Sequence, residues 1–88
     1  MHFLITYRIS PGTRDEAQQR FMAGGGLPPD GVTMHQRWHL AGGLGGVVIA
    51  EGADVVAIGK WMQEWTDLLT FDVVPVMSDE EIQTVLGG

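Results

Sequence analysis

The stretch TMHQRWHL, residues 33–40, places His35, Arg37 and His39 at every second position of a segment that has the pattern of a β-strand. Alternate side chains of a strand point to the same face, so these three are expected to form one polar strip. Imidazole donates or transfers a proton near neutral pH, and guanidinium binds a carboxylate through two parallel hydrogen bonds. The strip therefore predicts a site for an anionic or aromatic small molecule.

Arg8 is expected on the same sheet face, in the first strand, where it would add a second positive group to the site. A plainer interpretation stays open, because histidine and arginine also occupy solvated strand faces and the rims of interfaces. No metal site is predicted, since residues four apart on a strand lie about 13 Å apart and His35 and His39 cannot share one ion. No cofactor is predicted either, although a single histidine can ligate haem.

The elements that hold this strip follow from hydropathy patterning and helix-capping signals. Thr13 with Glu16, and Ser78 with Glu81, stand at capping-box spacing, and Asp54 is a typical N-cap residue. The predicted elements are a strand over 2–9, a helix from about residue 14 to the glycines at 24–26, strands over 32–41 and 45–51, a helix over 55–65, a strand over 68–77, and a short tail helix after Ser78.

The order of these elements, β-α-β-β-α-β, is that of the ferredoxin-like α+β fold, in which two helices cover one face of a four-stranded antiparallel sheet. Residues 1–88 are expected to form a single domain, with Trp61 and Trp65 of the second helix in its core. Pro75 suggests an edge strand or a bulge, because proline cannot donate to a sheet. The other sheet face has no cover in this chain, so we expect a homodimer through that open face, a dimeric α+β barrel.

The tightness of the central hairpin turn decides which face carries the polar strip. A two-residue turn in the glycine run would pair His39 with Gly46 and His35 with Ala50. A three-residue loop would instead set His35 opposite Glu51 as an acid–base pair. We prefer the shorter turn, because it leaves the strip on the open face and gives the helices the apolar residues Met34, Trp38, Leu40, Val47 and Ile49.

Composition excludes several classes of function. Eleven acidic against five basic residues give a net charge of −6, which disfavours nucleic acid and anionic membranes as partners. The chain has no cysteine, so disulfides, thiolate catalysis and thiolate metal sites are excluded. No apolar run approaches the ~20 residues of a membrane span, and the first residues lack the pattern of a signal peptide. A cytoplasmic protein is therefore expected.

Several stretches together resemble a known family: LPPDG at 27–31, Trp38, the pair AE at 50–51, and above all WMQEWTDLLTFDVVPVMS at 61–78. Over nearly its whole length the chain resembles the small bacterial proteins known as domain of unknown function 3303. That family is similar in pattern to the dimeric α+β barrel superfamily, which contains small-molecule monooxygenases, haem-degrading enzymes, muconolactone-isomerase-like enzymes and ligand-sensing domains. The resemblance implies the fold and the dimer but no particular function, because one fold hosts many chemistries.

Three functions are compatible with the sequence. The favoured one is a homodimer that binds or senses a small molecule between the sheet faces through His35, Arg37 and His39, with Arg8 nearby. The second is an enzyme of the cofactor-free monooxygenase or isomerase kind, in which a histidine moves the proton. The third is a structural or interaction module whose open sheet face only dimerises.

Overall fold

A computed structural model describes residues 1–88 and contains one antiparallel sheet with the strand order β2-β3-β1-β4. The predicted α+β, ferredoxin-like arrangement with a C-terminal helix is confirmed, and β4, which contains Pro75, is an edge strand. The elements in chain order are β1 (His2–Ile9), a 3-10 turn (Pro11–Thr13), α1 (Arg14–Gly24), β2 (Val32–His39), β3 (Gly45–Gly52), α2 (Val55–Gln63), β4 (Leu69–Val76) and α3 (Asp79–Gly87).

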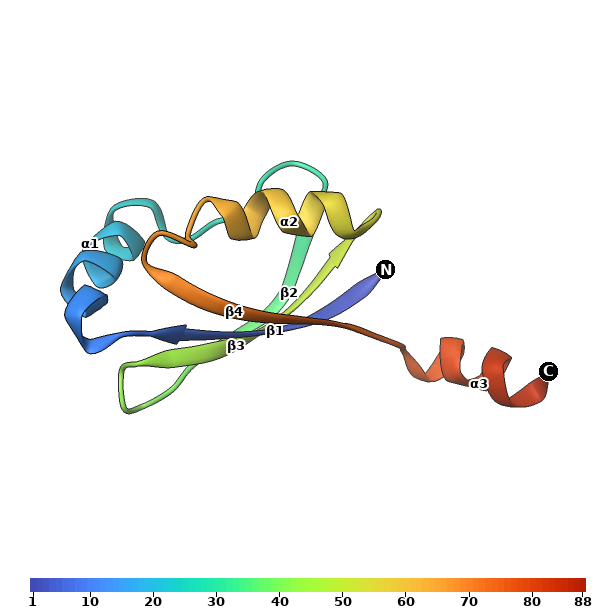
Figure 1. Cartoon of the computed structure of the whole chain (residues 1–88). Coiled ribbons are helices and arrows are strands. Elements are labelled where there is room, and N and C mark those ends of the chain that lie inside the picture. The colour runs from blue at the N-terminus through green and yellow to red at the C-terminus, as the bar shows by residue number, and fades with distance from the viewer.

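Helices α1 and α2 lie on one side of the sheet, whereas α3 extends away from it (Figure 1). The apolar stripe of α2 and the alternation of β1 explain this layering, because each presents one apolar side to the other. No helix has both the length and the apolar character needed to cross a membrane. The core between sheet and helices includes Phe3, Ile5, Tyr7, Ile58, Trp61 and Met62.

Two of the three predicted helix caps are confirmed. The Asp54 carboxylate accepts hydrogen bonds from two backbone N–H groups in the first turn of α2, and Ser78 and Glu81 form the reciprocal capping box of α3. The prediction for Thr13 is wrong, because a 3-10 turn precedes α1 and the Thr13 side chain makes no cap hydrogen bond. Its hydroxyl instead donates to the carbonyl oxygen of Leu68 at 3.0 Å, which ties the start of α1 to the start of β4.

The pairing of β2 with β3 contains a β-bulge. Near the hairpin turn the register is as predicted, with His39 opposite Gly46. Farther along, Met34 rather than His35 lies opposite Ala50, because one extra residue is inserted at this point. An inserted residue reverses which side chains point to each face beyond it.

The bulge overturns the prediction that the polar strip lies on one face. Arg37 and His39 point to the helix side of the sheet, where both line a cavity. His35 and Arg8 lie on the open face and are exposed. The four residues predicted for one site are therefore divided between two faces.

The apolar residues of β2 and β3 are also distributed differently from the prediction. Trp38 and Leu40 are 67% and 57% exposed, so neither is a core residue. Val47 and Ile49 are half-buried on the open face. The run GGVVIA is apolar on both faces, so hydropathy alone does not determine its orientation. Gly46 and Ala50 face the helices, where they leave space for Tyr7 and Phe3, their large partners on β1.

Candidate functional site

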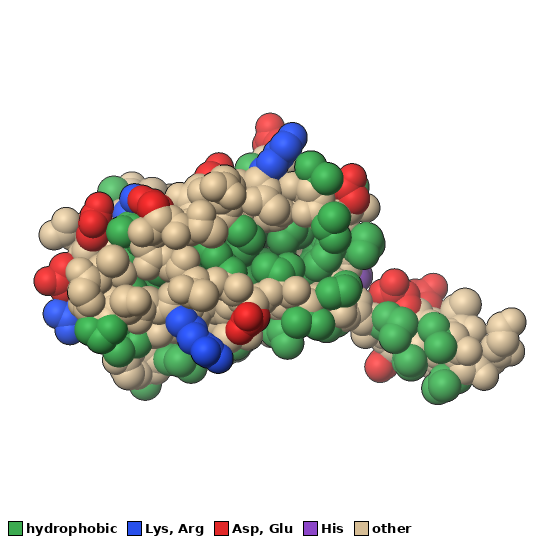
Figure 2. Space-filling view, in the orientation of Figure 1, with side chains coloured by type: hydrophobic (Ala, Val, Ile, Leu, Met, Phe, Trp, Pro, Cys, Tyr) green, Lys and Arg blue, Asp and Glu red, His purple; other side chains and the backbone are tan.

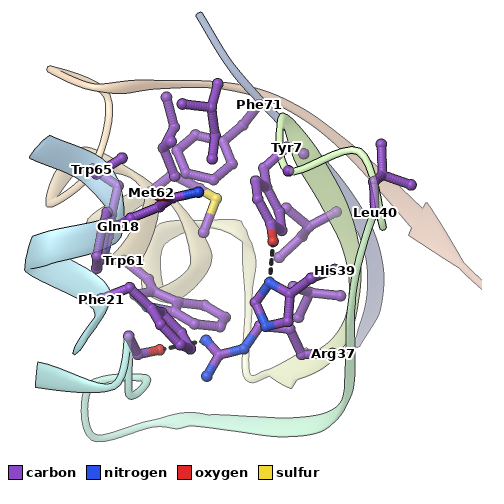
Figure 3. A pocket seen from close by; sticks show the side chains of 18 of the residues that line it. Tyr7, Gln18, Phe21, Arg37, His39, Leu40, Trp61, Met62, Trp65 and Phe71 are labelled. Carbon is purple, nitrogen blue, oxygen red and sulfur yellow. Dashed lines mark hydrogen bonds between the residues drawn. The ribbon is translucent and has the colours of Figure 1, made fainter. Parts of the chain in front are cut away.

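A cavity of about 400 Å³ lies between the helix side of the sheet and helices α1 and α2 (Figure 3). Thirteen of its 19 lining residues are hydrophobic, so the enclosure is apolar with a small number of polar groups. Sites for small organic molecules have this size and this mixture of groups. The aromatic part of the lining consists of Tyr7, Phe21, Trp61, Trp65 and Phe71.

Tyr7, which is buried, and His39, which is exposed, form a polar pair in the cavity lining. The Tyr7 hydroxyl and His39 Nδ1 are joined by a hydrogen bond, and the Phe21 ring meets the imidazole edge-on with 5.2 Å between centroids. Burial raises the pKa of the Tyr7 phenol above its ordinary value, and the charge of Arg37 lowers that pKa by a smaller amount. When the protonated phenol donates to Nδ1, the neutral imidazole carries its proton on Nε2 and can donate it to a ligand.

Gly46 provides the space in which Tyr7 reaches His39. It lies opposite Tyr7 on β1 and opposite His39 on β2. A Cβ atom at this position would lie 2.5 Å from the Tyr7 hydroxyl oxygen and 2.3 Å from the carbonyl oxygen of Trp38. The Tyr7–His39 pair therefore requires glycine at position 46.

Arg37 lies at one end of the cavity, where its guanidinium binds the end of α1. Nη1 and Nη2 donate to the carbonyl oxygens of Gly26 and Gly25, each at 2.8 Å, and the guanidinium stacks over Phe21 at 4.8 Å. Burial lowers the pKa of this guanidinium, an effect that Tyr7 partly offsets, but arginine keeps its charge at neutral pH. With two of its five donors engaged, Arg37 supplies a fixed positive charge rather than a free carboxylate clamp.

Two glycines after α1 allow the backbone to turn so that its carbonyl oxygens face Arg37. Gly25 ends the helix in the left-handed conformation, with φ of 74°, and Gly26 follows with φ of 57°. A Cβ atom on Gly26 would lie 2.9 Å from Arg37 Nη1 and 3.1 Å from the Phe21 ring. The glycine run that the sequence marks only as a helix end therefore also receives Arg37.

Arg20 of α1 and Asp67, in the loop after α2, connect the two helices that cover the cavity. The Arg20 guanidinium donates to both Asp67 carboxylate oxygens, at 2.9 and 2.7 Å, and to the carbonyl oxygen of Glu64. It also stacks over Trp65 at 5.3 Å. The hydrogen bond from Arg20 is the main reason that the pKa of Asp67 is lowered. This contact fixes α1 against the end of α2 and so helps to define the cavity wall.

Comparison with known proteins identifies the family. The model of the family described as a domain of unknown function (DUF3303) matches residues 1–88. The chain belongs to the DUF3303 family. No curated protein matches it significantly. The solved structure of Rv0793 from Mycobacterium tuberculosis is similar, with a TM-score of 0.54 and 13% sequence identity over 89% of this chain and 96% of that chain. A likeness at this identity shows the shared fold alone.

In this DUF3303 chain, the residues predicted for one site belong to two places. Arg37 and His39 line the cavity, whereas Arg8 and His35 lie across the sheet from it. His35 Nε2 is 2.9 Å from Glu51 Oε1, and the hydrogen bond from His35 lowers the pKa of that carboxylate. The acid–base contact considered for a longer hairpin loop thus exists, but the bulge produces it and it is exposed rather than buried.

Sequence reasoning missed the importance of Tyr7 in the DUF3303 cavity. A signal was present, because Phe3, Ile5 and Tyr7 occupy every second position of β1 and so share the face that packs against the helices. Trp61 was expected in the core and is buried, while Trp65 is half-buried at the cavity wall. What the sequence lacked was the pairing of β3 with β1, which places Gly46 and its partner His39 on the same side as Tyr7.

Proposed function

We propose that this chain binds a small molecule with an aromatic or aliphatic body and an anionic or hydrogen-bonding group, and that it does so as a homodimer. The observation that carries the proposal is the apolar cavity with the hydrogen-bonded Tyr7–His39 pair in its lining. The ligand site is placed between the sheet and the helices of one chain. This replaces the expected position between two sheet faces, because Arg37 and His39, two of the four residues expected there, face the helices.

Shape and charge both favour such a ligand. Rings and aliphatic side chains on several sides would bury an apolar body, while His39 and Tyr7 offer hydrogen bonds to one polar group. Arg37 lines the cavity, so its positive charge lies close to a bound molecule. That charge would stabilise an anionic group of the ligand.

The open sheet face supports the homodimer. Its exposed and half-buried apolar side chains form a continuous surface over three or more strands, with Leu4, Trp38, Val47, Ile49 and Val74. Hydrophobic side chains also gather between α2 and β4 and along α3 (Figure 2), where α3 has no sheet to cover. A second copy is the occupant that we propose, because these apolar side chains lie next to one another on a sheet face that no part of this chain covers.

Binding can be tested with 2-naphthoate and its neutral analogue 2-naphthalenemethanol. A Trp38→Phe variant leaves only the two cavity tryptophans as fluorophores, so their emission reports the cavity. We expect saturable binding of one molecule per chain, weakened about 5-fold in His39→Gln, since one hydrogen bond is worth about 1 kcal/mol. His35→Gln, on the other face, is the matched control and should bind normally.

Native mass spectrometry of gently purified protein tests the same proposal without a chosen probe. A dimer that retains an extra mass would support both parts of it. A ligand-free chain that also binds neither naphthalene compound would contradict the binding site, and a monomer would contradict the homodimer.

The Tyr7–His39 hydrogen bond favours one second candidate, an enzyme that moves a proton in cofactor-free oxygenation or isomerisation. In that case His39→Gln would abolish turnover of an enolisable aromatic acid while its binding persists. Equal turnover in His39→Gln and the parent chain would exclude this role.

A further inference from the structure

A second group of chemically active side chains lies on the open face, across the sheet from the cavity. His2 of β1, His35 of β2 and Glu51 of β3 direct one ligand atom each to a common point, and these atoms lie within 4.8 Å of one another. His35 Nε2 is 2.9 Å and His2 Nε2 is 3.5 Å from the same oxygen, Glu51 Oε1. The two imidazole rings stack with 5.5 Å between centroids.

The bulge in β2 is what assembles this group. His2 and Glu51 are direct cross-strand partners, so their side chains share a face. His35 joins them because it is the inserted residue, with Met34 already opposite Ala50. Bulges often redirect a side chain at a functional site.

Glu81 adds an outer partner to the group. Its Oε1 lies 3.7 Å from His2 Nδ1, the ring nitrogen that does not point to Glu51. The same oxygen accepts a hydrogen bond from the backbone N–H of Ser78, so the capping box of α3 holds it in place. A carboxylate at the second ring nitrogen is the usual companion of a metal-binding histidine, because it leaves the lone pair on the first. Figure 2 shows a histidine beside acidic side chains where α3 leaves the sheet.

We propose that His2, His35 and Glu51 bind one divalent transition-metal ion, with Zn²⁺ as the representative ion. Two imidazole nitrogens and one carboxylate oxygen are ligands that Zn²⁺ and its neighbours prefer, whereas Mg²⁺ and Ca²⁺ prefer oxygen alone. In a tetrahedral zinc site with bonds of 2.0–2.1 Å, ligand atoms lie about 3.3 Å apart. The distances of 2.9 and 3.5 Å to Glu51 Oε1 are close to that spacing, so small side-chain movements would complete the site.

The exposure of the group determines what kind of site this is. The side chains of His2, His35 and Glu51 are 33%, 42% and 45% exposed. In the single chain, three protein ligands with solvent on one side leave a fourth position for water, for an atom of a bound molecule or, in the proposed dimer, for an atom of the second copy. The site is independent of the proposed cavity function, since the sheet separates the two and they share no residue.

The test is a titration of the metal-free full chain, purified without a histidine tag, with Zn²⁺ followed by calorimetry. We expect one Zn²⁺ per chain. His35→Gln and Glu51→Gln should weaken binding at least about 100-fold, and Glu81→Gln about 10-fold, because outer-shell partners contribute 10- to 100-fold. Co²⁺ in place of Zn²⁺ should give the intense visible absorption of a four-coordinate site, lost in His35→Gln.

Two controls make the test decisive. His39→Gln, the third histidine of the chain, should bind Zn²⁺ like the parent, and circular dichroism should show that every variant is folded. Binding that survives in both His35→Gln and Glu51→Gln but disappears in His2→Gln would assign the metal to His2 with the Met1 amine and overturn the proposal. Absence of Zn²⁺ binding by the parent chain would overturn it as well.

Discussion

His35 and His39 lie on opposite faces of the sheet although they belong to the same strand and are four positions apart. In a regular strand they would share a face. The bulge beside His35 breaks this rule and leaves His39 with Tyr7 in the cavity and His35 with Glu51 on the open face. One inserted residue therefore creates two separate polar sites where the sequence suggests one.

Replacing Gly46 with alanine should destabilise the fold and disturb the cavity. The new Cβ would overlap the Tyr7 hydroxyl and the carbonyl oxygen of Trp38. Crowding of this kind costs about 1–3 kcal/mol, which urea denaturation would measure directly. Gly42→Ala is the control, because its Cβ would meet no atom within 4 Å. Equal stability of the two variants would show that Tyr7 does not need the space above position 46.

Much of the fold could be predicted because its signals are local. The capping residues Asp54 and Ser78 mark the starts of α2 and α3, and the alternation of β1 marks its buried face. Which side chains of β2 and β3 point to the helices could not be predicted in this way. Val47 and Ile49 are as apolar as their neighbours, and the bulge at His35 has no marker such as glycine or proline next to it.

The candidate cavity shows the same division between local and long-range signals. Trp61 was expected in the core, and the alternation of β1 groups Tyr7 with buried residues, so part of the lining was available from the sequence. Arg37 and His39 reach it because their partners on β3 pair with the buried side of β1. Tertiary pairing, not local pattern, decides which residues meet there.

Tyr7 should titrate above the ordinary tyrosine value of 10.0, because burial disfavours the charged phenolate. It is the only tyrosine, so the ultraviolet absorbance of tyrosinate follows this residue alone. A raised pKa in the folded state means that its stabilising contribution is complete below the unfolded value and is lost as pH rises through the folded value. A folded-state midpoint at or below 10.0 would contradict the buried position, and urea-unfolded protein supplies the reference titration.

Asp67→Asn should reduce stability near neutral pH and make stability less dependent on pH in the acid range. The hydrogen bond from Arg20 lowers the pKa of Asp67 below its ordinary value of 3.8. A lowered pKa adds stability above the unfolded value, and that stability is lost as pH falls through the folded value. The difference should shrink in high salt, because the pair is exposed. Asp30→Asn, in the loop before β2, is the control. The measurement is the melting temperature of each variant across the acid range. The same pH dependence in Asp67→Asn and Asp30→Asn would contradict the pairing of Arg20 with Asp67.

The homodimer predicts a different response from two exposed apolar residues. Trp38 is 67% exposed in the single chain and lies on the open face, whereas Leu27 is 70% exposed in the loop after α1. If a second copy covers the open face, Trp38→Lys should raise the dimer dissociation constant at least about 30-fold, since a tryptophan buried in an interface contributes about 2 kcal/mol or more. Leu27→Lys should leave the dimer intact. Because neither side chain supports the core, both variants should keep the parent circular dichroism spectrum.

Size-exclusion chromatography with light scattering then measures the dimer, and an unchanged dimer in Trp38→Lys would mean that the copies join through another surface.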